Sequence, residues 1–263
     1  MERFAQDRIP AESARIAFYF FLSLFPFLLV LFSLTGLLGR EAAFHWIMGD
    51  LTAALPGQAS RALEQVVAEV TRIRSPGALS IGLLLLVWAA SNTFASLSDG
   101  LNKAYRVDRQ HHWWKQRTLA LALLVVASVA LISAAVVLLA GPEIGRVLGW
   151  EGFESFLRWP VTFVLAVGLM WLIYFWLPNH DQDRAKRRIL VGAVVGTFLW
   201  AVATVLFRLY VANFGRFSLV YGFVGGIVVL LLWLYLTAMS ILIGGEVAAA
   251  LERRSSKASL HDS

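Results

Sequence analysis

The chain has 263 residues, of which 59% are hydrophobic and only 15% are charged. Soluble domains usually carry about 25% charged residues, so this composition excludes an ordinary soluble protein and indicates a membrane protein. The sequence contains no cysteine, which excludes disulfides and thiolate metal sites. Its net charge of +6 favours anionic lipid headgroups over nucleic acid as partners.

Six segments without a charged residue are long enough to cross a bilayer as helices. They lie at approximately 16–39, 75–98, 118–142, 159–180, 189–207 and 217–245. The sequence therefore predicts an all-α integral membrane protein, a six-transmembrane-helix bundle that forms a single membrane domain over residues 1–251. The remaining residues, 252–263, are predicted to form a flexible cytoplasmic tail.

The distribution of Lys and Arg among the connecting segments predicts the orientation. Fifteen of these residues fall in the segments on the side of the two termini, and eight fall on the other side. Because Lys and Arg are enriched in cytoplasmic loops, both termini are predicted to be cytoplasmic.

The connection between the first and second segments, residues 40–74, contains a helical pattern of its own. After the breaker Pro56-Gly57, apolar residues recur at helical spacing from Ala59 to Ile73. We predict an amphipathic extracytoplasmic helix at about 58–74. It either packs on the bundle, lies in the membrane interface or binds a partner.

Polar side chains follow one face of the second segment. Asn92, Asp99, Asn102 and Arg106 stand at offsets of 0, 7, 10 and 14 residues, which places them on one side of a helix. Such a stripe either lines a wet cavity or forms hydrogen bonds with neighbouring helices. These residues are therefore candidates for substrate binding.

One aromatic and basic cluster and a second, purely basic cluster suit the headgroup layer, where aromatic rings lie in the interface and cations point toward phosphate. The predicted contacts to lipid headgroups are Trp113, Trp114, Lys115, Arg117, Arg187 and Arg188. The neighbouring His111 and His112 point in different directions on a helix, so no metal site is predicted there.

Small residues in the last two segments predict close helix packing. Gly192 and Gly196 form a GxxxG pair, and Ser240, Gly244 and Ala248 recur every four residues. Packing within the chain is the favoured interpretation. The same ridges also suit contact with a second copy of the chain or with an envelope protein.

The last segment has 29 uncharged residues and ends directly before Glu246. A straight helix of that length would reach roughly 43 Å, longer than the hydrocarbon core of about 30 Å. We therefore predict a break at Gly222–Gly226, either a kink or a re-entrant turn. Glu246 is a candidate for proton or cation coupling, or else a helix-end residue in the interface.

Further candidates for contact with a substrate are Tyr19 and Ser23, one helical turn apart in the first segment, Tyr221 beside the glycines, and Arg208 near the outer interface. Ordinary packing, or a cation that reaches the interface, is the alternative for each of them.

Several stretches resemble the YihY/BrkB family of bacterial inner-membrane proteins, some of which were once labelled ribonuclease BN. They are AFYFFLSLFPFLLVL, SLSDGLNKAYRV, LPN and YGFVGGIVVLLLWLYLTAMSILIGGEVAAAL. The resemblance implies a multi-pass protein of the bacterial inner membrane with six helices and both termini inside. The family pattern matches this chain at Ser23, Pro26, Asn102, Tyr105, Pro178, Asn179, Tyr221, Gly222 and Glu246. It adds Tyr105 to the candidates for substrate binding.

Transport or flipping of a lipid or another amphipathic envelope substrate is the favoured function. The pattern GxxxxGK[ST] does not occur, so the chain has no ATPase of its own. The alternatives are a scaffold or regulator of envelope assembly and a channel for small solutes. We expect no catalytic residue, metal or cofactor, because cytoplasmic loops of about 10 to 20 residues are too short to form the charged groove that a ribonuclease needs.

Overall fold

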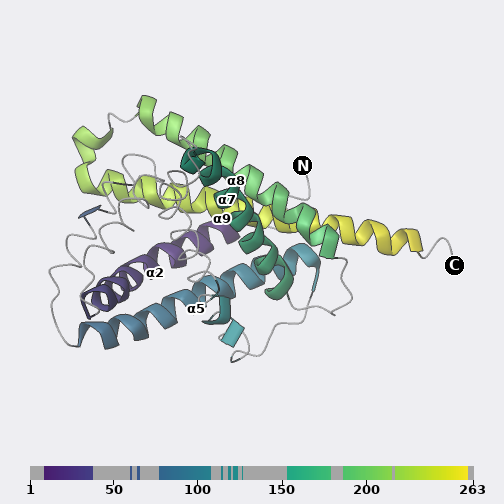
Figure 1. Cartoon of the computed structure of the whole chain (residues 1–263), viewed down its shortest axis with the longest axis horizontal. Helices are drawn as coiled ribbons and strands as arrows, with labels where there is room; N and C mark the ends of the chain where they lie inside the picture. The colour runs from purple at the N-terminus through teal and green to yellow at the C-terminus, as the bar shows by residue number, and fades with distance from the viewer. Residues whose placement is uncertain are drawn as a thin grey trace. The chain divides into compact units, whose positions relative to one another are not determined.

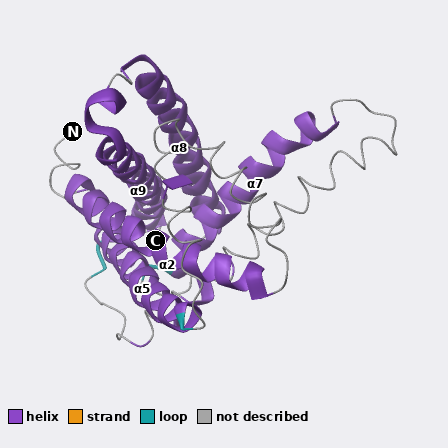
Figure 2. Cartoon of the chain, turned by 90° about the vertical axis from the view of Figure 1, so that its left-hand side faces the viewer, coloured by secondary structure: helices purple, strands orange, loops and turns teal. Residues whose placement is uncertain are grey.

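The computed structural model describes five helices, α2 (Ile9–Leu37), α5 (Ala78–Tyr105), α7 (Phe153–Trp176), α8 (Lys186–Phe214) and α9 (Phe217–Ser259), shown in Figure 1. The described residues are 9–37, 77–107, 153–178, 186–214 and 217–259, with a few more between 60 and 126. All regular structure in these ranges is α-helix (Figure 2), which confirms the all-α part of the predicted fold class.

Four of these helices contain a stretch long and apolar enough to cross a membrane: Ile9–Val30, Ser80–Tyr105, Lys186–Ala212 and Val224–Arg253. A shorter apolar helix covers Pro160–Trp176. Between 28% and 44% of the residues in the most apolar stretch of each span are buried, so more than half of the residues in these stretches keep exposed surface. Outward apolar side chains are what lipid requires.

Two predicted elements fall largely outside the described residues. They are the span at 118–142 and the amphipathic helix at 58–74. The count of six spans and the extracytoplasmic helix therefore stay predictions.

The helices extend past the predicted spans. The second span was expected to end at residue 98, but α5 continues through Gly100 to Tyr105. The two ends differ because the end of an uncharged run marks where the apolar surface stops, whereas a helix ends where its backbone is capped. Polar residues continue a helix without difficulty.

The last helix, α9, is assigned as one helix of 43 residues. Gly222–Gly226 therefore lies inside a helix, and Figure 1 shows the first turns of α9 bent away from the axis of the rest. Residues 252–259, predicted as part of a flexible tail, continue the helix. The stretch ERRSSKAS contains no Gly or Pro, and its Glu, Arg, Lys and Ala residues favour the helix.

The chain divides into two compact units, each built from distant parts of the sequence. The first unit comprises Met1–Leu97 and Trp200–Ser240, and the second comprises Ser98–Leu199 and Ile241–Ser263. The helices α5, α8 and α9 contribute residues to both.

In the first unit, α2 and the first part of α5 lie side by side and run antiparallel (Figure 1). The late part of α2 contacts the start of α5, where Val30, Leu86 and Ala90 form a buried cluster with Phe27 packed against it. A Cβ added to Gly82 would clash with the side chain of Leu29, so this glycine allows the close approach.

In the second unit, α8 crosses α9 at small residues. A Cβ on Gly192 would lie 2.7 Å from the carbonyl oxygen of Gly244, and a Cβ on Gly244 would lie 2.7 Å from the Cα of Gly196. Real Cβ atoms do not approach so closely, so the two backbones are nearly in contact. The predicted packing of the GxxxG pair within the chain is confirmed.

Candidate functional site

A group of interacting polar side chains in the second unit lies near the end of α5. Arg253 of α9 donates from Nη1 to the carbonyl oxygen of Ala104, at 2.6 Å. Its Nη2 atom lies 3.6 Å from Oε2 of Glu246, so Arg253 and Glu246 form an ion pair. Because the last carbonyls of a helix have no partner within it, the guanidinium of Arg253 caps α5.

The backbone conformation of Arg106 terminates α5. Its φ of 57° lies in the left-handed region, and its N–H donates to the carbonyl of Lys103 at 3.0 Å. The N–H of Val107 donates to the carbonyl of Asn102 at 2.9 Å, which completes a Schellman motif. The predicted helical stripe is therefore wrong at its last member, because Arg106 lies just past the helix.

Asn102 is buried and hydrogen-bonded. Its Nδ2 atom donates to Oγ of Ser98 at 3.5 Å, and that hydroxyl donates to the carbonyl of Leu177 at 2.9 Å. Leu177 directly follows α7, so these two bonds connect α5 to the end of α7. Polar groups inside a membrane protein are costly unless bonded, and these are bonded to protein.

Tyr174 of α7 is fully buried and ties its helix to α9. Its hydroxyl donates to the carbonyl of Ile241 at 2.7 Å. A side chain on Gly244 would clash with this hydroxyl, so the glycine makes room for the tyrosine as well as for α8.

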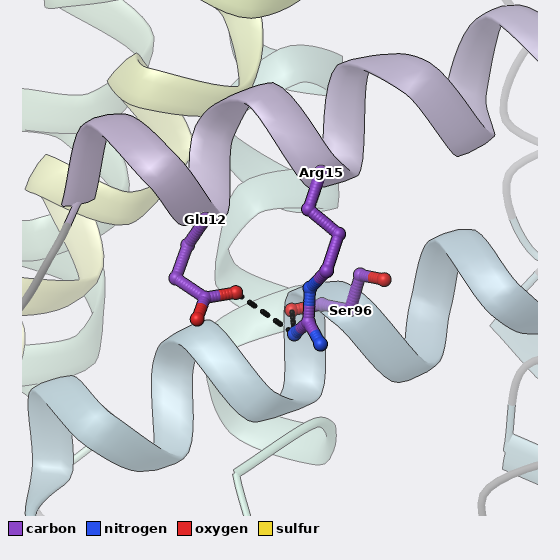
Figure 3. Close-up of polar contacts among 3 residues, drawn as sticks. All are labelled: Glu12, Arg15 and Ser96. Carbon is purple, nitrogen blue, oxygen red and sulfur yellow. Dashed lines mark hydrogen bonds and ion pairs between the residues drawn. The ribbon is translucent and has the colours of Figure 1, made fainter.

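In the first unit, an ion pair joins Glu12 and Arg15 on the first turns of α2 (Figure 3). The Nη2 atom of Arg15 lies 2.8 Å from the carboxylate and 3.4 Å from the carbonyl oxygen of Ser96 on α5. The side chain of Glu12 is 11% exposed and that of Arg15 is 40% exposed, so only the carboxylate of this pair is largely shielded from solvent. The carboxylate also suits the positive end of the helix dipole.

The predicted candidates are distributed over both units. Asp99, Asn102, Tyr105, Arg106, Trp114, Arg187, Arg188 and Glu246 belong to the second unit, and Tyr19, Ser23, Asn92, Arg208 and Tyr221 belong to the first. Glu246 is brought next to the end of α5 through Arg253. The hydroxyl of Ser23 donates to the carbonyl of Phe20 in its own helix, at 2.7 Å.

Exposure separates the candidates further. Arg106, Trp114, Arg187 and Arg208 are exposed, whereas Tyr19, Ser23, Asn92, Asp99, Tyr105 and Arg188 are half-buried. The predicted headgroup contacts Trp113, Lys115 and Arg117 lie outside the described residues, as does the side chain of Tyr221.

Sequence reasoning missed several residues that the structure brings into contact. Glu12 and Arg15 are spaced i, i+3, and Glu246 and Arg253 are spaced i, i+7, so a search for opposite charges at helical spacing would have found both pairs. Nothing in the sequence marks Ser98 or Tyr174, because the carbonyls that they bind belong to residues far away in the chain.

The arrangement suits binding and charge coupling. Within the described ranges, no three side chains of His, Asp or Glu converge as a metal site requires. Two ion pairs in the described helices, Glu12–Arg15 and Glu246–Arg253, instead join a carboxylate to an arginine that also contacts a backbone carbonyl. Charges near a membrane interior generally pair in this way.

The whole chain, residues 1–263, matches the family model described as Virulence factor BrkB. It is similar to the ribonuclease-like protein YfkH of Bacillus subtilis (strain 168), with 30% identity over 93% of this chain and 90% of that protein. It is also 27% identical to the UPF0761 membrane protein of Tolumonas auensis, over 93% and 81% of the two chains. The UPF0761 membrane protein VV0203 of Vibrio vulnificus (strain YJ016) is 27% identical, over 96% and 80%. No solved structure matches the chain.

Proposed function

Because this membrane protein belongs to the Virulence factor BrkB family, we propose that it transports or flips a lipid or another amphipathic envelope substrate. A chain made almost entirely of apolar helices acts on what is in or beside the bilayer. The proposed location is the bacterial inner membrane, with both termini cytoplasmic. Movement is downhill, ion-coupled or driven by a partner, since no nucleotide-binding loop is present.

The observation that carries this proposal is the ion pair of Glu246 and Arg253. Glu246 lies inside the last apolar span, Val224–Arg253, and Arg253 is the last residue of that span. Both side chains are half-buried, at 21% and 33% exposed. A charged pair in such a place is costly and marks functional sites in membrane proteins. Protonation of Glu246 would release Arg253 from its carboxylate, so the pair offers a means of coupling.

The test is Glu246→Gln, measured in proteoliposomes as the flipping of NBD-labelled phosphatidylglycerol with dithionite as quencher. We expect the rate of flipping to fall at least ten-fold, because glutamine cannot carry the charge of Glu246. The fold should remain, because Arg253 keeps its bond to the carbonyl of Ala104 and a partly exposed ion pair contributes under about 1 kcal/mol.

The matched control is Glu64→Gln, the same change at an exposed carboxylate that bonds to Ser60 in its own helical turn. This variant should flip lipid at the wild-type rate. If the folded Glu246→Gln protein also flips at the wild-type rate, the coupling role is wrong.

A scaffold or regulator of envelope assembly is the second candidate. It is favoured by Asn102, which is 4% exposed and bonded to Ser98, since a stripe that lines a wet path would keep polar groups open to water. Single cysteines at residues 92, 99 and 102 of this cysteine-free chain distinguish the two functions. Reaction with a small water-soluble thiol reagent supports transport or a small-solute channel, and protection at all three supports the scaffold.

The proposed partners are anionic lipids at the cytoplasmic face, with a second copy of the chain or an envelope protein as a further partner. We do not extend the ribonuclease-like name of the Bacillus relative to this chain. RNA hydrolysis needs a charged groove and usually an acidic metal cluster. Incubation of the purified protein with labelled RNA tests this directly.

A further inference from the structure

A cleft of about 470 Å³ lies between α7 and the start of α8 in the second unit. Its apolar walls are Val164, Val167 and Leu190, and its floor includes Gly168. A Cβ added to Gly168 would meet no atom within 4 Å, so the space above this glycine is open. The volume falls within the range of about 300 to 1,000 Å³ that is typical of ligand sites.

One wall of the cleft is held in place by Trp171. Its Nε1 atom donates to the carbonyl of Lys186 at 3.4 Å, which ties α7 to the first residue of α8. Its ring also stacks on Phe175, with centroids 5.1 Å apart and planes 7° from parallel. The indole therefore presents a fixed apolar surface to the cleft.

Two basic residues belong to the lining of the cleft, whose surface is almost entirely apolar. Lys186 and Arg187 both line it, and both are exposed. They stand at the end of a candidate membrane span, Lys186–Ala212, where lipid headgroups lie. The first turn of α8 contains no acidic residue, so nothing in that turn neutralises them.

We infer that this cleft binds one acyl chain of an anionic phospholipid, with the lipid phosphate held by Lys186 and Arg187. Apolar walls next to a pair of cations at a span end complement a molecule that has a hydrocarbon chain and a negative headgroup. A soluble anion would contact only the two cations, and a neutral lipid would contact only the apolar walls. The inference rests on the proposed function in taking a membrane lipid as ligand, and it names where that lipid binds.

Native mass spectrometry of the full-length protein in mild detergent tests this inference. The protein is titrated with phosphatidylglycerol and with phosphatidylcholine of the same acyl chains, and the dissociation constant of the first bound lipid is measured. Each cation near phosphate contributes about five-fold in affinity, so we expect the wild type to prefer phosphatidylglycerol by at least ten-fold.

Two variants separate the headgroup from the acyl chain. The double variant Lys186→Gln with Arg187→Gln should abolish the preference while phosphatidylcholine still binds. Gly168→Leu fills the open space and should weaken both lipids to a similar extent while the preference remains. This second variant is expected to fold, because its Cβ enters empty space and leucine favours a helix more than glycine does.

Lys103→Gln is the matched control, since it removes one exposed cation of the same unit that does not line the cleft. It should leave the preference unchanged. The inference is wrong if this control reduces the preference as much as the double variant, if Gly168→Leu has no effect, or if excess inorganic phosphate displaces the lipid. Because only binding is measured, these outcomes leave the flipping assay of the wild type to decide the proposed function.

Discussion

Two arginines, Arg106 and Arg253, use different groups to end the same helix. Arg253 binds the carbonyl of Ala104 through its guanidinium, and Arg106 supplies the left-handed residue of the Schellman motif. A non-glycine residue in the left-handed region is uncommon and costs roughly 1 kcal/mol. The end of α5 therefore keeps an arginine where a glycine would be less strained.

We predict that Arg106→Gly raises the free energy of unfolding by about 0.5 to 1 kcal/mol, because glycine adopts a positive φ without steric cost. Chemical unfolding in detergent micelles, followed by circular dichroism, measures the change. The control is Lys103→Gly, three residues earlier inside α5, which should lower the same free energy by about 1 kcal/mol. If Arg106→Gly is destabilising, the arginine side chain makes a contact that outweighs the strain.

At the residue scale, the sequence identified polar side chains that form contacts in the structure, but it did not predict the partners of those side chains. Asn102 and Glu246 were singled out, and the structure gives both of them polar partners. Those partners, Ser98 and Arg253, were not predicted. A hydrogen bond or ion pair depends on distances between atoms, and a sequence pattern gives only the direction in which a side chain leaves its helix.

At the scale of elements, small residues determine how closely the helices pack. Gly192, Gly196 and Gly244 let α8 and α9 nearly touch, and Gly82 does the same for α2 and α5. Without a hydrophobic effect between helices in lipid, such close van der Waals contact is a main source of association. These glycines should therefore be sensitive to the smallest added side chain.

We predict that Gly192→Ala and Gly244→Ala each lower the free energy of unfolding by about 1 to 3 kcal/mol, because the new methyl group would overlap backbone or side-chain atoms. Gly168→Ala is the control on α7, where the added Cβ would meet nothing. It should be neutral or stabilising by up to about 1 kcal/mol. The micelle unfolding assay applies to all three, and equal effects at the three sites would contradict the packing argument.

At the scale of the whole molecule, helix directions bear on the predicted topology. In the second unit α8 runs antiparallel to α9, and in the first unit α2 runs antiparallel to α5. These directions are the ones that alternating spans require. The cytoplasmic location of both termini stays a prediction, and so does the number of spans, because residues 118–142 are largely outside the described ranges.

Thiol labelling in intact cells and in spheroplasts with permeabilised membranes tests the orientation. The natural chain has no cysteine, so single cysteines can be introduced without background. We predict that Ala5→Cys and Ser259→Cys react with an impermeant maleimide only after permeabilisation, and that Thr52→Cys in the 40–74 connection reacts in intact cells. Labelling of Ala5→Cys and Ser259→Cys from opposite sides would contradict an even number of spans.

The sequence by itself determined that this is a helical membrane protein, where most of its apolar helices lie, and that its glycine pairs pack closely. These properties follow from composition and from the period of the helix, which are local. Only the tertiary structure decided that Arg253 caps α5, that Tyr174 joins α7 to α9, and that a cleft opens above Gly168. Each of these depends on residues far apart in the chain, and no local pattern records which helices become neighbours.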